Sequence, residues 1–280
     1  MKLSRTEARK RGRALLAEAG IGDAFRDADL LLMHVTGLHM QDLLSEPGEP
    51  LDVRQAQAYE ELLQRRALRI PLAYLTNSWS FMGLEFKTDA RALIPGQDTE
   101  FVTEEAMKHL HDGMRFLDLC TGTGCIALSL ARYSNDTTGV ATDLSEEALS
   151  LARENAADLR IDNVRFVLCD LFPADEAPFD LIVSNPPYIR TREIDTLQEE
   201  VRLHAPRMAL DGGEDGLSFY RRIITSAPRY LCRGGYLVLE TGYDQTEAVE
   251  TLMEERGFLH IGVHRDYAGN PRCVTGCYYV

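Results

Sequence analysis

Apolar positions in the first part of the chain recur at the spacing of an amphipathic helix. Ser4 and Glu7 have the spacing of a capping box and precede an apolar run, which predicts a helix at the start of the chain. Similar patterns predict helices over residues 24–35 and about 52–66. Residues 1–69 are therefore expected to form a small helical bundle.

The pattern then changes from helical spacing to alternation. Residues 78–81 and 84–87 alternate on either side of Met82-Gly83, which predicts a β-hairpin. Trp79 is expected to pack this hairpin against the region that follows. Residues 70–93 are accordingly predicted to be a linker.

From residue 94 to residue 280 the pattern is one of strands separated by helices. This alternation predicts an α/β domain in which helices cover both faces of a mostly parallel sheet. The last two strands follow each other without a helix, which predicts an antiparallel pair at the end of the sheet. The predicted strands are Arg115–Leu119, Thr138–Thr142, Val164–Leu168, Leu181–Ser184, Tyr236–Leu239, Leu259–Val263 and Cys273–Tyr279.

The first of these strands leads into a glycine-containing turn and a helix, a pattern typical of nucleotide-like cofactor sites. The turn is Cys120-Thr121-Gly122-Thr123-Gly124, and its glycines allow a ligand to approach the backbone closely. Asp143 ends the next strand about twenty residues later, where a carboxylate can accept hydrogen bonds from ribose hydroxyls. Rossmann dehydrogenases use a similar turn, but position 127 is Ala where their third glycine would stand, and no hydride-transfer site is visible.

A second acidic position follows the third predicted strand. Asp170 and Leu171 stand at the carboxyl edge of the predicted parallel sheet, where ligands bind. We expect Asp170 to accept a hydrogen bond from an exocyclic adenine amine, and apolar neighbours such as Leu171 to pack on the ring. Taken alone, an Asp at such a place is more often a helix cap or a turn residue.

The most informative segment is Asn185-Pro186-Pro187-Tyr188, directly after an apolar strand. The two prolines have no N–H, so the segment presents carbonyl acceptors, and Asn185 adds a side-chain carbonyl. Two acceptors directed at one NH2 group would orient its nitrogen and stabilise the positive charge that develops as it attacks a methyl group. Tyr188 can stack on a planar amide or base. Methyl transfer to an amide or amine nitrogen is therefore the predicted chemistry.

Composition and charge limit the possible partners. The net charge of −14 argues against a protein that grips a nucleic-acid backbone, so no direct nucleic-acid binding is expected. Small basic clusters near the start of the chain are interpreted as solvated helix faces. These clusters are Lys10, Arg11 and Arg13, and then Arg65, Arg66 and Arg69.

No targeting, membrane or metal signal emerges from the sequence. The start of the chain leads into a charged helix rather than a secretory signal, and no apolar run is long enough to span a bilayer. The six cysteines show no Cys-x-x-Cys pair and no zinc spacing, so reduced thiols, a cytoplasmic location and no metal are expected.

These motifs together resemble the class I S-adenosylmethionine-dependent methyltransferases, and nearly the whole chain resembles the release-factor glutamine methyltransferases, the PrmC/HemK family. Asn-Pro-Pro-Tyr is shared with adenine-N6 DNA methyltransferases, whereas Pro95-x-x-Asp98-Thr99-Glu100 and Gly212-Gly213-x-Asp215-Gly216-Leu217 are much more specific. Further matches are Arg69-x-Pro71-x-x-Tyr74, Phe81-x-Gly83-Leu84-x-Phe86, Phe219-Tyr220, Gly234-Gly235, Glu240 and Asp266-x-x-Gly269.

The resemblance implies a Rossmann-like fold, a cofactor and a substrate. The family transfers a methyl group from S-adenosylmethionine to the glutamine side-chain nitrogen (N5) of a Gly-Gly-Gln motif in peptide-chain release factors, leaving S-adenosylhomocysteine. By resemblance, Asn185 and the Pro186 carbonyl hold the glutamine amide and Tyr188 packs on it, while Pro187 completes the substrate site. The cofactor would be bound by the turn from Cys120 to Gly124 and by Asp143, Asp170, Leu171 and Asn185. The N-terminal bundle would help dock the protein substrate, and a monomer is expected.

Departures from the family pattern leave the choice of protein substrate open. Gly96 and Gln97 replace the usual Arg and Pro, Cys120 replaces the first glycine of the turn, and Ala205 replaces a Glu. A glutamine in another protein, such as a ribosomal protein, remains an alternative target. Adenine-N6 methylation of nucleic acid is a second alternative, and a non-catalytic scaffold is disfavoured because both Asn185 and Asp143 are present.

Overall fold

The chain folds into two compact units. The computed structural model describes residues 3–46, 48–174, 176 and 178–279. One unit runs to Ser78 and includes Gln198–His204, and the other consists of Trp79–Leu197 and the chain from Ala205 onward. Among the described residues, no helix is long and apolar enough to cross a membrane.

The first unit is a helical bundle around its own apolar core. The Ser4–Glu7 capping box is present, with Glu7 N donating to Ser4 Oγ over 3.3 Å and Ser4 N donating to Glu7 Oε2 over 2.9 Å. The short helices α3 and α5 were not predicted, because five or six residues are too few to show a helical period. The helices are α1 (Arg5–Glu18), α2 (Ala24–Thr36), α3 (Met40–Ser45), α4 (Val53–Ala67), α5 (Leu72–Thr76) and α9 (Glu199–His204).

Ion pairs inside this unit correct one expectation from the sequence. Arg66 is only 7% exposed, and its Nε lies 2.7 Å from Asp27 Oδ2. Arg66 and Arg69 both pair with Glu200 of α9, at 3.1 and 3.4 Å. The prediction of a solvated helix face is therefore wrong for Arg66, because a buried guanidinium requires carboxylate partners.

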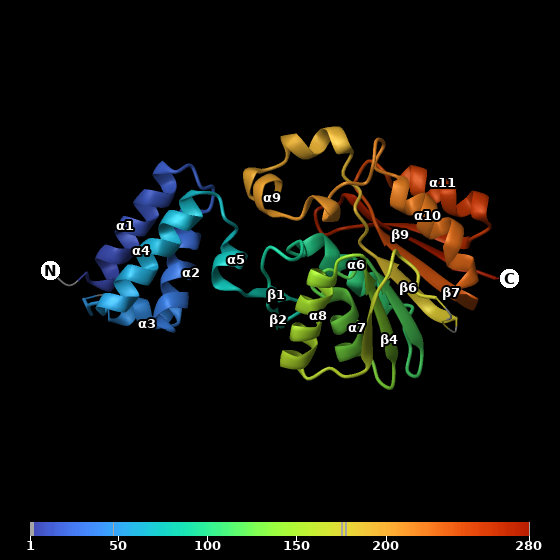
Figure 1. The fold of residues 1–280 in the computed structure, drawn as a ribbon, viewed down its shortest axis with the longest axis horizontal. Coiled ribbons are helices and arrows are strands. Elements are labelled where there is room, and N and C mark those ends of the chain that lie inside the picture. Colours follow the sequence, from blue (N-terminus) through green and yellow to red (C-terminus); the bar gives the residue numbers. More distant parts are fainter. Residues whose placement is uncertain (1–2, 47, 175, 177, 280) are drawn as a thin grey trace. The chain divides into compact units, whose positions relative to one another are not determined.

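The second unit is an α/β domain, and the predicted α/β class is confirmed. Its main sheet has seven strands in the order β5-β4-β3-β6-β7-β9-β8 (Figure 1). The first five are parallel to one another. β9 runs antiparallel to β8, as the sequence predicted, and also antiparallel to β7. The strands are β3 (Arg115–Leu119), β4 (Thr138–Asp143), β5 (Val164–Leu168), β6 (Phe179–Ser184), β7 (Leu231–Glu240), β8 (Leu259–Arg265) and β9 (Pro271–Tyr278).

Helices cover both faces of this sheet because successive strand side chains point to opposite faces. In β6, Leu181 and Val183 pack into the core beneath α6, α7 and α8, whereas Ile182 packs into the core beneath α10 and α11. The helices are α6 (Gln97–Met107), α7 (Cys125–Tyr133), α8 (Glu146–Leu159), α10 (Ser218–Ser226) and α11 (Thr246–Arg256), with short 3-10 turns η1 (Thr191–Thr196), η2 (Arg207–Ala209) and η3 (Ala227–Arg229).

The predicted hairpin consists of β1 (Trp79–Phe81) and β2 (Leu84–Phe86). It belongs to the second unit, where Phe81 and Phe86 are buried in the core below α6 and α7 and Trp79 packs against it. The Met82 N–H donates to Glu100 Oε1 of α6 over 2.6 Å. Within the 70–93 region predicted as a linker, α5 thus packs with the first unit and the hairpin with the second.

Candidate active site

A cavity of about 380 Å³ opens in the second unit, where the carboxyl ends of β3, β4 and β6 meet. This is the edge at which parallel α/β sheets bind ligands, because the loops that follow the strands diverge there. The sequence-predicted residues that line it are Cys120, Thr121, Gly122, Thr123, Asp143, Asp170, Leu171, Asn185 and Pro187. Gly124, Pro186 and Tyr188 are not among the lining residues.

The turn after β3 takes its shape from three residues in the left-handed region of backbone space. The φ angles are 58° at Cys120, 55° at Gly122 and 81° at Gly124. A Cβ at Gly124 would lie 3.1 Å from the Cβ of Ala152, so this glycine lets α7 start close against α8. Cys120 takes a conformation that costs a non-glycine residue about 1 kcal/mol.

Backbone hydrogen bonds hold the Asp143 carboxylate beside this turn. Its Oδ2 accepts from Gly122 N and its Oδ1 from Ser145 N, both over 2.9 Å. Burial raises the pKa of the carboxyl, and the two backbone N–H groups act against that rise. Each oxygen keeps a second lone pair, so the carboxylate can also accept from a pair of ribose hydroxyls.

A second carboxyl, that of Asp118 in β3, accepts hydrogen bonds from the turn and from α7. It is fully buried, and its Oδ2 accepts from Thr121 Oγ1 over 2.6 Å and from Ala127 N over 3.2 Å. Burial raises the pKa of Asp118 to about 7. Asp118 therefore joins the turn to the first residues of α7.

Asp170 and Leu171 line the cavity after β5, at the sheet edge that the sequence indicated, but the Asp170 carboxylate already has a partner. Its Oδ2 lies 2.7 Å from Arg222 of α10, and its side chain is 54% exposed. The Leu171 carbonyl accepts from Thr142 Oγ1 over 2.7 Å, which fixes this segment to β4. A ligand amine at Asp170 would share the carboxylate with Arg222.

In the tetrapeptide after β6, Asn185 and Pro187 line the cavity, whereas the Tyr188 hydroxyl lies in the protein interior. Asn185 lines the cavity and its Nδ2 donates to Thr99 Oγ1 over 3.0 Å. The Tyr188 hydroxyl donates to Glu240 Oε1 over 3.3 Å, and burial raises the pKa of this phenol. The hydroxyl end of Tyr188 is thus held by an interior carboxyl.

A glycine-rich loop, residues 211–216, lies directly against this tetrapeptide. Gly212 N donates to Ile189 O over 2.8 Å. A Cβ at Gly212 would lie 2.7 Å from the Tyr188 Cα and 2.8 Å from the Pro187 carbonyl oxygen. Only glycine allows this approach, so the loop holds the backbone of the tetrapeptide in place.

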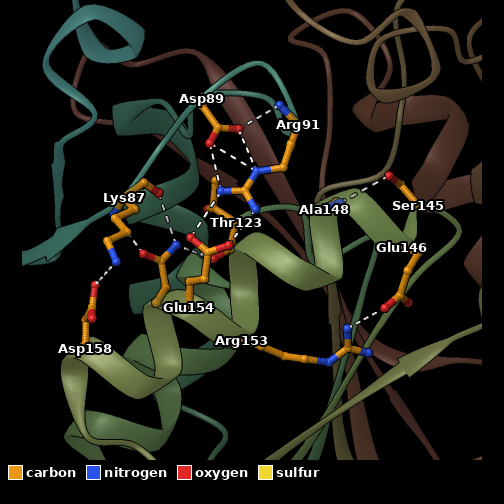
Figure 2. Close-up of polar contacts among 11 residues, drawn as sticks. Lys87, Asp89, Arg91, Thr123, Ser145, Glu146, Ala148, Arg153, Glu154 and Asp158 are labelled. Atoms are coloured by element: carbon orange, nitrogen blue, oxygen red, sulfur yellow. Dashed lines mark hydrogen bonds and ion pairs between the residues drawn. The ribbon is translucent and has the colours of Figure 1, made fainter.

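Several cavity residues were not assigned a role from the sequence. Thr99, on the first turn of α6, has a sequence signal, because it belongs to the Pro-x-x-Asp-Thr-Glu motif. Arg91 is held by Asp89 and Glu154, with Nη1 lying 2.6 Å from Glu154 Oε1 (Figure 2). Other lining residues of this kind are Pro95, Pro206, Met208 and Phe219. In the described part of the chain no group of three or more His, Cys, Asp or Glu side chains could hold a metal ion.

Comparisons with known proteins identify two matching domain families and several close relatives. Residues 7–76 match the PrmC N-terminal domain family and residues 110–275 match a methyltransferase domain family. The release factor glutamine methyltransferase of Geobacter sulfurreducens is 40% identical over 265 residues, covering 94% of this chain and 93% of its own. That of Vibrio cholerae is 40% identical over 269 residues, with coverage of 94% and 93%.

The fold also has a counterpart among solved structures. A methyltransferase from Pyrococcus furiosus superposes with a TM-score of 0.57 at 20% identity, over 78% of this chain and all of that one. This likeness concerns the fold alone, whereas the relatives share sequence over nearly their whole length. The chain belongs to the release factor glutamine methyltransferase family.

Proposed function

We propose that this protein methylates the side-chain amide nitrogen (N5) of the glutamine in the Gly-Gly-Gln motif of peptide-chain release factors. The family makes it an S-adenosylmethionine-dependent protein-glutamine methyltransferase. The observation that carries the choice of an amide substrate is the side chain of Asn185, which lines the cavity while its NH2 group is bound to Thr99. Its carbonyl oxygen is left to accept from a substrate NH2.

The residues around the cavity fit the cofactor. Gly122 and Asp143 would hold the ribose and the adjoining backbone, and Asp170 and Leu171 the adenine ring. The rigid turn supports this assignment, because Asp143 is already oriented by two backbone N–H groups. When bound, S-adenosylmethionine supplies a methyl group on a positively charged sulfur, and S-adenosylhomocysteine is the product.

The substrate amide would be held by acceptors rather than activated by a base. Asn185 Oδ1 and the Pro186 carbonyl would each accept one N–H of the glutamine, and Pro187 and Tyr188 would complete the site. This holds the nitrogen in line and stabilises the positive charge that it gains during transfer. One N–H proton is released to water after the new bond has formed.

The remaining parts of the proposal concern the setting of the reaction. The N-terminal unit would dock the release factor. The whole protein would act as a monomer in the cytoplasm and would not bind nucleic acid itself. The match of residues 7–76 to a domain named for this family supports a dedicated role for that unit.

Label transfer tests the proposed substrate. Methyl-labelled S-adenosylmethionine is incubated with the protein and a purified release factor, and with the same factor carrying Ala in place of the Gly-Gly-Gln glutamine. Label on the unchanged factor alone is the expected result. Label on neither factor, with cofactor binding intact, would refute the release-factor assignment and direct the search to ribosomal proteins and nucleic acid.

Two variants of the protein test the site. Asn185→Ala should lower kcat about 100-fold or more, because the transferring nitrogen loses an acceptor, while the Kd for S-adenosylmethionine stays within about twofold. Asp143→Ala is the matched comparison, and it should weaken cofactor binding instead. Unchanged turnover in Asn185→Ala would remove that residue from the mechanism.

A further inference from the structure

Behind Asn185 lies a chain of hydrogen bonds that ends at a buried carboxyl. Asn185 Nδ2 donates to Thr99 Oγ1 over 3.0 Å, and Thr99 Oγ1 donates to Glu240 Oε2 over 2.7 Å. Thr99 is 3% exposed and Glu240 is 2% exposed. Asn185 directly follows β6, Thr99 lies on α6 and Glu240 ends β7, so the tertiary fold alone brings them together.

The direction of this chain follows from the donors and acceptors that each group has. An ionised carboxylate can only accept hydrogen bonds, so Glu240 accepts the one hydrogen bond that the Thr99 hydroxyl can donate. The Thr99 oxygen can then only accept from Asn185, which requires the NH2 group rather than the carbonyl of that amide to face it. Without this constraint, the amide could turn by half a revolution and present its NH2 to the cavity.

We propose that Glu240 and Thr99 are positioning residues that keep the carbonyl oxygen of Asn185 directed at the substrate amide. This inference rests on the proposed role of Asn185 as an acceptor. A reversed Asn185 would place one NH2 group against another and lose the hydrogen bond that orients the nitrogen. The relay therefore fixes the polarity of the substrate site by orienting Asn185.

The surroundings of Glu240 favour its role as an acceptor. The Tyr188 hydroxyl donates to its other oxygen, so each carboxylate oxygen accepts a hydrogen bond from a neighbouring hydroxyl. Asp98 on α6 and Arg272 on β9 also face it, with opposite charges. Burial raises the pKa of Glu240 to about 7, so assays at about pH 8 keep the carboxyl ionised.

Substitutions at position 99 separate the hydroxyl from the shape of the side chain. Thr99→Val keeps the branched shape and removes the relay, and should lower kcat about tenfold, the value of one hydrogen bond, with the cofactor Kd within about twofold. Thr99→Ser keeps the hydroxyl and should restore kcat to within about threefold. Thr103→Val is the matched control, and kcat should not change. Its buried hydroxyl, on the same helix, donates to the Thr99 carbonyl over 2.7 Å and has no other partner among the described residues.

A second position tests the other end of the relay. Glu240→Met removes the acceptor, and Thr99 is then free to donate to Asn185. Because Glu240→Met also removes the partner of the Tyr188 hydroxyl, it should lower kcat at least as much as Thr99→Val does. The double variant should lose no more than Glu240→Met alone, since Thr99→Val then breaks a relay that is already broken. Additive losses in the double variant would instead indicate two independent packing defects and overturn the proposal.

The outcomes separate this inference from the proposed function. A wild-type kcat in Thr99→Val, or an equal loss in Thr103→Val, overturns the relay while Asn185→Ala remains inactive. Full turnover in Asn185→Ala would overturn the acceptor role and the relay with it. If Thr99→Val fails to fold, Glu240→Met decides, and a wild-type kcat in that variant overturns the relay.

Discussion

At the scale of single residues, the site depends on backbone positions where no side chain fits. A Cβ at Gly212 would lie 2.8 Å from the Pro187 carbonyl oxygen and 2.7 Å from the Tyr188 Cα, both closer than van der Waals contact. The atoms it would meet belong to backbone, which cannot rotate away as the end of a flexible side chain can. The cost of a substitution there should therefore appear in catalysis as well as in folding.

Gly212→Ala should lower kcat about 10–100-fold, because the added methyl pushes the segment that holds the substrate out of line. The cofactor Kd should change little, since Gly212 is not among the residues that line the cavity. Steady-state kinetics and calorimetry measure both quantities. Gly22→Ala, where a Cβ would meet nothing within 4 Å, is the control, and equal losses in both variants would contradict the steric explanation.

At the scale of elements, one side chain of α8 joins the segment after the hairpin (residues 87–91, here called the strap) to the turn after β3. Asn155 is 1% exposed, accepts from Lys87 N over 2.7 Å, and donates to the carbonyls of Lys87 and Thr123 over 3.1 and 3.0 Å. The neighbouring ion pairs of the same strap, from Arg91 to Asp89 and Glu154, are drawn in Figure 2. Asn155 thus satisfies three backbone groups that the helix and strands leave unpaired.

Asn155→Ala should lower the free energy of unfolding by about 2–3 kcal/mol, because it leaves buried backbone groups without partners. Urea unfolding followed by circular dichroism measures this change. Arg153→Ala on the same helix removes an exposed pair with Glu146 and should cost no more than about 0.5 kcal/mol. Equal costs for the two variants would show that the strap contributes no more than a surface pair.

At the scale of the whole molecule, buried carboxyls link stability to pH. The pKa values of Asp118 and Glu240 are raised by burial to about 7. A carboxyl whose pKa is higher in the folded state contributes stability that is complete below its unfolded pKa of about 4 and is lost as pH rises through about 7. The Tm should therefore fall between about pH 4 and pH 7.

Asp118→Asn cannot ionise, so its Tm should fall less over this range than that of the wild-type protein. Differential scanning fluorimetry at several pH values gives the two slopes. Only the slopes are compared, because the amide also changes the bonds to Thr121 and Ala127 at every pH. Parallel slopes would mean that Asp118 is ionised in the folded protein throughout the range.

What the sequence by itself determined is what local patterns encode. The periods of apolar residues predicted the strands of the sheet and the three longer helices of the N-terminal part. The glycines of the turn and the two prolines after β6 marked two segments that contribute to the cavity, because backbone freedom and missing donors are properties of the residues themselves. Short helices such as α3 and α5 escaped this reasoning, since they complete too few turns to show a period.

Only the tertiary structure decided which distant residues meet. Thr99 lies 86 positions before Asn185 and 141 before Glu240, and Asn155 lies 68 positions after Lys87. No periodicity in the chain reports such contacts, because they follow from the order of strands in the sheet and from the helix that packs above them. The sequence thus identified the groups that we propose carry the chemistry, and the tertiary fold placed Thr99 and Glu240 behind one of them, Asn185.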